Sequence, residues 1–144
     1  MHPAVLLVEA DASSRDALRL ILEEAGYAVS EAADSTAALG LLRLNLSRKR
    51  PHRLVVLVHH AVPEVDGVGM LRAIAGDPHL ATHHAYVLLA TPHEPSFPTI
   101  DQEVLSYLTV AVVPRPIERD VLLSAVAQAA RGLGMEPSGA GRRD

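Results

Sequence analysis

The stretch that decides the fold is LVVLVHHAVPEVDG, residues 54–67. Its five aliphatic residues, 54–58, predict a short strand that is buried on both faces, as a central strand of a parallel sheet is. His59 and His60 follow, and Pro63 and the Asp66-Gly67 pair then predict a loop before a helix over residues 67–75. The stretch therefore predicts a strand, a loop and a helix, with an imidazole at the carboxyl end of the strand.

Aliphatic runs and helical spacing alternate along the rest of the chain. Further strands are predicted over residues 5–8, 28–31, 85–90 and 110–113. One helix is predicted to begin at Asp11 or Ser13 and to end at Gly26, and a second to begin near Ser35. Two more are predicted over residues 99–107 and 118–133. Gly76-Asp77-Pro78 is expected to end the helix at 67–75. The apolar residues expected to face the core of the first and last helices are Ala17, Leu18, Ile21, Leu22 and Ala25, and Val121, Leu122, Ala125, Val126 and Ala129.

This alternation predicts the α/β class, with a flavodoxin-like, doubly wound sheet of five parallel strands in the order 2-1-3-4-5 and five helices. Residues 1–133 are expected to form one domain and residues 134–144, rich in Gly, Pro, Ser and Arg, a flexible C-terminal tail. In such sheets a site lies at the carboxyl ends of the strands. The residues expected there are Glu9, Ala10, Asp11, His59, His60, Ala90, Thr91 and Arg115.

Composition limits the classes of function. The chain has 144 residues, of which 49% are hydrophobic and 21% charged, which favours one globular domain. It has no cysteine, which excludes disulfides and thiolate metal sites, and no apolar run long enough to cross a bilayer. The net charge of −4 offers no general attraction for nucleic acid. We therefore expect a cytoplasmic protein that binds neither membranes nor nucleic acids.

Four short motifs, in their order and spacing, resemble those of bacterial response regulator receiver domains. They are LLVEAD at 6–11, EAGYAV at 24–29, VPEVDG at 62–67 and RPI at 115–117. The resemblance covers about residues 4–133. It implies a part in two-component, phosphorelay signal transduction, in which a receiver accepts a phosphoryl group on an aspartate.

The positions that carry this chemistry in the family are altered here. The family's acidic pair falls on Glu9 and Ala10, with Asp11 one residue further, and its acceptor aspartate falls on His59. The remaining pocket positions fall on Ala90, with Thr91 beside it, and on Arg115, while the family's aromatic switch position falls on Val112. The resemblance thus implies a degenerate, pseudoreceiver-like pocket.

Such a pocket is not expected to be phosphorylated on an aspartate. Mg²⁺ prefers oxygen ligands, and Ala10 and His59 remove two of the carboxylates that would supply them. We expect no cofactor, no metal, no catalytic residue and no enzyme activity. The predicted function is phosphorylation-independent contact with a protein, a sensor kinase or an output protein. A homodimer is the alternative use of the surface formed by residues 99–107, 110–113 and 118–133, with Leu105, Val121 and Leu122.

Several alternatives remain open at the altered pocket. Glu9, or Asp11, can favour the imidazolium form of His59 and, with Arg115, produce a self-neutralised pocket; otherwise His59 is neutral and structural. A small-molecule or metal sensor is the alternative function, with His59, His60, Glu9 and Asp11 as ligand types suited to Zn²⁺ or Ni²⁺. Outside the pocket, His83, His84 and His93 are predicted to be solvated. The basic residues Arg43, Arg48, Lys49, Arg50 and Arg53 are predicted to form a solvated surface, with an acidic partner as the alternative.

Overall fold

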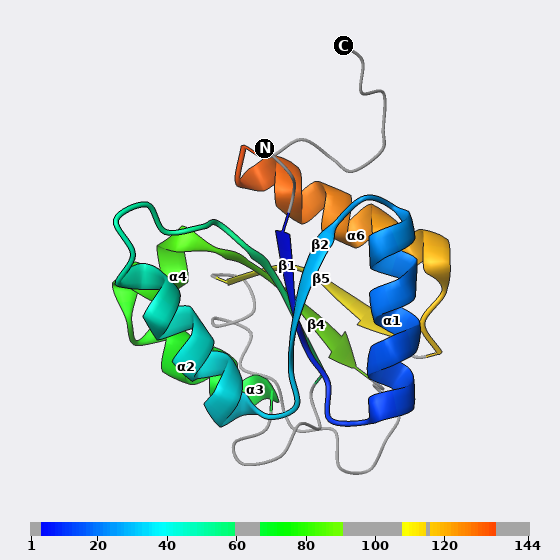
Figure 1. Ribbon diagram of the computed structural model, residues 1–144, viewed down its shortest axis with the longest axis horizontal. Helices are drawn as coiled ribbons and strands as arrows, with labels where there is room; N and C mark the ends of the chain where they lie inside the picture. Colours follow the sequence, from blue (N-terminus) through cyan, green and yellow to red (C-terminus); the bar gives the residue numbers. More distant parts are fainter. Residues whose placement is uncertain (1–3, 60–66, 91–107, 115, 135–144) are drawn as a thin grey trace.

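Five parallel strands form one sheet in the order β2-β1-β3-β4-β5 (Figure 1). The computed structural model describes residues 4–59, 67–90, 108–114 and 116–134. Within these ranges the strands are β1 (Ala4–Val8), β2 (Ala28–Ala32), β3 (Val55–His59), β4 (Ala85–Ala90) and β5 (Thr109–Pro114). The predicted class and strand order are confirmed.

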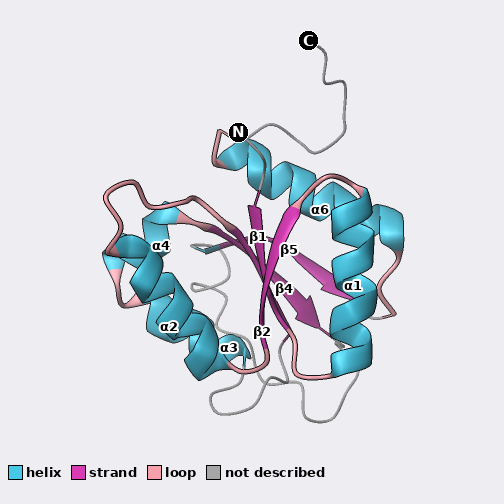
Figure 2. Cartoon of the chain, in the orientation of Figure 1, coloured by secondary structure: helices cyan, strands magenta, loops and turns pink. Residues whose placement is uncertain are grey.

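Helices cover both faces of this sheet (Figure 2). One face carries α1 (Ala12–Glu24) and α6 (Arg119–Gly132). The other carries α2 (Ser35–Leu46), α3 (Gly67–Ala75) and α4 (Pro78–His83). The helix predicted at residues 99–107 lies outside the described residues.

Side chains of the central strands alternate between two cores. Val55 and Leu57 of β3 pack under α1 and α6, whereas Val56 and Val58 pack under α2, α3 and α4. Since successive residues of a strand point to opposite faces, a strand covered on both sides must be aliphatic throughout. This explains why the run at 54–58 predicted the centre of the sheet.

Side-chain caps fix where α1 and α2 begin. The Asp11 carboxylate accepts a hydrogen bond from the Ser14 N–H at 2.8 Å, and Asp34 accepts one from the Ala37 N–H at 2.7 Å. Of the two predicted caps of the first helix, Asp11 is therefore the one used, rather than Ser13. Gly26, with φ of 99°, follows the end of α1 in the left-handed conformation that glycine adopts without strain.

Two predictions of burial and one of surface exposure are wrong. Ala17 is exposed, because the face of α1 that packs against the sheet is formed by Leu18 and Leu22, with Ile21 and Ala25 partly buried. Val121 is 44% exposed, since it lies at the edge of the buried stripe of α6. Leu122 belongs to that stripe and is fully buried, so it is not part of a surface.

Helix α4 was not predicted. Pro78 was taken as a stop for the preceding helix, but it stands in the first turn of a new one, where proline loses no intrahelical bond. Asp77 is the N-cap, and its carboxylate accepts from the His79 N–H at 3.1 Å. The short helix brings His84 against the start of β4. His84 is buried, so the prediction that it is solvated is wrong.

Candidate functional site

The carboxyl ends of β1 and β3 bring Glu9 and His59 together. These strands are adjacent, with Val8 opposite Val58, so the next residue of each lies at the same edge of the sheet. The His59 Nδ1 lies 3.5 Å from the Glu9 Oε2, within the range of an ion pair. The Glu9 side chain is 2% exposed and that of His59 15%. A buried carboxylate next to an imidazole is thus the centre of the site.

Backbone contacts hold Glu9 in this position. Its N–H donates to the Ala32 carbonyl at 3.0 Å, which extends the pairing of β1 with β2 by one residue. Its Oε2 also accepts a hydrogen bond from the Asp11 N–H at 3.1 Å. The Arg15 Nη1 donates to the carbonyls of Glu9, at 2.8 Å, and Ala10, at 3.3 Å. The turn from β1 into α1 is therefore fixed by β2, through Ala32, and by α1, through Arg15.

Asp11 and Ala10 contribute little to a pocket at this edge. The Asp11 Oδ2 caps α1, so this oxygen is directed at the helix rather than at His59. Ala10 is exposed and has no side-chain donor or acceptor. Glu9 is thus the acid that the structure places against His59.

The other predicted pocket residues are only partly described. Ala90 is the last residue of β4 and pairs with Pro114 of β5, so its backbone reaches the same edge of the sheet. His60, Thr91 and Arg115 lie outside the described residues.

The residues present do not fit the Mg²⁺ ion that receivers with an aspartyl acceptor employ. Mg²⁺ needs several oxygen ligands in near-octahedral geometry. Here Ala10 offers no ligand, His59 offers nitrogen, and the Glu9 Oε2 already contacts His59 and the Asp11 N–H. Within the described ranges there is also no group of three or more His, Asp or Glu side chains that could hold a metal ion.

A buried histidine, His84, lies at the opposite end of the sheet, and the sequence analysis did not predict its burial. Its Nδ1 accepts a hydrogen bond from the Leu54 N–H at 3.0 Å, so the proton of the neutral ring is on Nε2. The buried Nε2 has no hydrogen-bond partner in the described part of the chain. Burial, helped by the charges of His83 and Arg53, lowers the pKa of His84 to about 4. Its place directly before a buried strand was the signal in the sequence.

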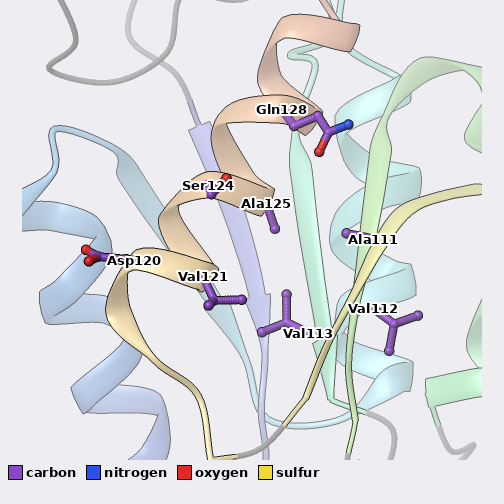
Figure 3. Close-up of a pocket in the computed structure, with 8 residues that line it drawn as sticks. All are labelled: Ala111, Val112, Val113, Asp120, Val121, Ser124, Ala125 and Gln128. Atoms are coloured by element: carbon purple, nitrogen blue, oxygen red, sulfur yellow. The ribbon is translucent and has the colours of Figure 1, made fainter.

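An open groove lies between β5, an edge strand, and α6 (Figure 3). Its volume is about 380 Å³. Val112 and Val113 of β5 and Val121 of α6 supply apolar walls, and Asp120 and Gln128 are among its polar residues. Val112, which the resemblance places at the aromatic switch position of receivers, is exposed. The groove belongs to the part of the predicted partner surface that the structure describes, which is formed by β5 and α6.

No family model and no curated protein sequence matches the chain. Solved structures do match. A response regulator receiver domain protein (CheY-like) from Methanospirillum hungatei JF-1 is 25% identical, with a TM-score of 0.72, over 90% of this chain and 95% of that one. The signal receiver domain of a signal transduction histidine kinase from Syntrophus aciditrophicus is 26% identical, with a TM-score of 0.70, over 99% and 95%. A sensor protein from Polaromonas sp. JS666, 22% identical over 91% and 98% with a TM-score of 0.73, has the same fold.

The strand order, the helices on both faces and these matches define the class of protein. The chain has the CheY-like form of the flavodoxin-like fold. This is the fold of the response regulator receiver domains that it matches, the family to which the four motifs pointed. None of the helices in the described part has the length and hydropathy needed to cross a bilayer.

Proposed function

We propose that residues 1–133 act in two-component signalling as a receiver that works without aspartyl phosphorylation. Of the tail predicted over residues 134–144, residues 135–144 lie outside the described residues. The domain acts in the cytoplasm by binding a protein, a sensor kinase or an output protein, rather than by catalysis. The observation that carries this proposal is the contact between the buried Glu9 and His59 at the end of β3, 3.5 Å apart. The chemistry of an acceptor carboxylate is replaced there by a pair.

The pair stabilises one state of the site. Burying a lone carboxylate is unfavourable, and a positive partner within about 4 Å offsets this energy. With His59 as imidazolium, the charge that a metal ion would bring is supplied by the chain itself. A self-neutralised pocket of this kind needs neither metal nor phosphoryl group to hold its conformation.

The surface that would bind the partner includes the groove between β5 and α6. Val113 and Val121 face each other across it, and Asp120, Ser124 and Gln128 offer polar contacts (Figure 3). The exposed Val112 points away from α6, on the other side of β5 (Figure 3). Exposed apolar area with polar residues around it is typical of protein interfaces. A second copy of the chain is the other occupant that this surface can take.

Exposure to phosphodonors tests the proposal. The wild-type protein, incubated with acetyl phosphate or beryllofluoride and Mg²⁺, should show no phosphoryl adduct by intact mass and no shift in Tm. The Ala10→Asp/His59→Asp double variant restores two carboxylates at the strand ends, and its Tm should rise with Mg²⁺. Ala10→Asn/His59→Asn is the matched control without added charge. Phosphorylation of the wild type that is cleaved by alkali and by hydroxylamine, as an acyl phosphate is, would refute the proposal. A Tm shift with transition metals or metabolites alone would favour a sensor instead.

A further inference from the structure

Charge is unevenly distributed along this chain. Residues 35–63 contain no aspartate or glutamate but hold five of the 13 basic residues, Arg43, Arg48, Lys49, Arg50 and Arg53. The rest of the chain holds all 17 acidic residues. A strongly basic segment is thus part of an acidic protein.

The fold places these cations together at the amino end of the sheet, opposite the Glu9–His59 pair. They lie on the last turns of α2 and on the loop that leads to β3 (Figure 1). All five are exposed, and within the described residues Arg43, Arg48, Lys49 and Arg50 form no ion pair. Arg19, by contrast, pairs with three acids. The α2 dipole favours one or two cations at its C-terminus, which does not account for five.

An apolar groove of about 200 Å³ lies directly beside this basic segment. Leu41 and Leu44 of α2 and Leu54 before β3 supply its apolar lining, while Arg48 and His52 are among its polar residues. Leu44 is 67% exposed, the largest value among the exposed large hydrophobic side chains of the described part. The exposed apolar area of Leu44 beside the groove is available to a binding partner.

Asn45 joins two of the segments that line the groove. This buried side chain donates to the His52 carbonyl at 2.9 Å and accepts from the His52 N–H at 3.0 Å. The two hydrogen bonds fix the basic loop against the end of α2. A preformed site loses less conformational entropy on binding than a mobile one.

We infer that this groove binds an acidic amphipathic segment of a partner protein. Apolar side chains of the segment would fill the space beside Leu41 and Leu44, and its carboxylates would pair with Arg48, Lys49 and Arg50. A phosphate backbone would use the cations but leave the leucines without a partner, and the described residues around the groove include no tyrosine, phenylalanine or tryptophan on which a base could stack. A bilayer is flat and suits projecting side chains better than a groove. This surface lies at the other end of the sheet from His59 and does not depend on the proposed function.

Binding of a defined peptide tests the inference. The probe is a helical peptide with leucines four residues apart between glutamates, and a permuted peptide of the same composition is its control. Addition to the ¹⁵N-labelled full chain should shift amide signals of residues 41–54, and the permuted peptide should bind at least roughly tenfold more weakly. Equal shifts with both peptides, shifts elsewhere, or no binding of the first peptide at millimolar concentration would overturn the inference. The inference would also be overturned if a single-stranded oligonucleotide or phosphatidylserine vesicles produced these shifts and the peptide did not.

Matched charge variants locate the site. Arg48→Glu/Arg50→Glu should weaken peptide binding roughly tenfold, as expected for the loss and reversal of two exposed ion pairs. Arg72→Glu/Arg131→Glu changes the net charge equally at exposed positions on α3 and α6 and should leave binding unchanged. Leu44→Ser removes the apolar contact and should weaken binding without lowering Tm, because this side chain is mostly exposed. Equal losses in both charge variants would show a nonspecific field and overturn the inference.

Discussion

Two histidines, the half-buried His59 and the buried His84, lie at opposite ends of adjacent strands and differ in what surrounds them. His59 ends β3 with the Glu9 carboxylate 3.5 Å from its ring. His84 precedes β4, and the charges that act on it are the cationic groups of His83 and Arg53. The same side chain is thus offered a negative partner at one end of the sheet and positive neighbours at the other. Burial alone does not decide what a histidine does; its charged neighbours do.

The two ends of the sheet also differ in the role of the histidine that each carries. At the carboxyl end, an acid and an imidazole meet at the edge where doubly wound sheets carry their sites. At the amino end, His84 accepts the Leu54 N–H and joins the loop before β3 to the start of β4. The first is the candidate functional site, and the second is a structural contact.

The largest expected effect is the dependence of stability on pH that His84 produces. Its pKa of about 4 in the folded protein lies below the ordinary 6.5, so between these values the unfolded chain binds a proton that the folded protein does not. The contribution of neutral His84 to the free energy of unfolding is therefore fully present above pH 6.5, and it falls by about 3 kcal/mol as the pH drops to 4. Urea unfolding at several pH values measures it.

His84→Asn is the matched variant, because its Oδ1 can still accept the Leu54 N–H. It should remove most of the pH dependence between 6.5 and 4 while the protein remains folded. His79→Asn, at an exposed position on α4, is the control and should leave the slope unchanged. An unchanged slope in His84→Asn would mean that other groups cause it.

A somewhat smaller effect is expected from breaking the pair at the other end. His59→Ala removes the imidazole that lies against a buried acid and should lower the free energy of unfolding at pH 7 by about 2 kcal/mol. Glu9→Gln in the same chain removes the charge, so the double variant should recover part of this loss. A double-mutant cycle in urea measures the coupling. Coupling near zero would indicate a neutral His59 with a structural role only.

The sequence predicted the sheet well because buried parallel strands must be aliphatic, and this pattern requires no tertiary information. Contact between Glu9 and His59 followed from strand order, since both stand at the same edge of the sheet. Helix α4 and the burial of His84 did not follow. Pro78 can end or begin a helix, and the Asp77 cap decides between these only through geometry. Likewise a polar residue beside a strand is buried or solvated according to what packs over it.

The smallest effect is expected at the cap that borders the site. Asp11→Ala removes the acceptor for the Ser14 N–H and should cost about 1 kcal/mol of stability. Asp34→Ala removes the corresponding cap of α2, away from the pair, and should cost a similar amount. The Asp11 backbone N–H also bonds to Glu9, so fraying of α1 should loosen the pair as well. NMR signals of the His59 ring should therefore shift in Asp11→Ala and not in Asp34→Ala. Equal responses would mean that the turn after β1 is held by Arg15 without help from the cap.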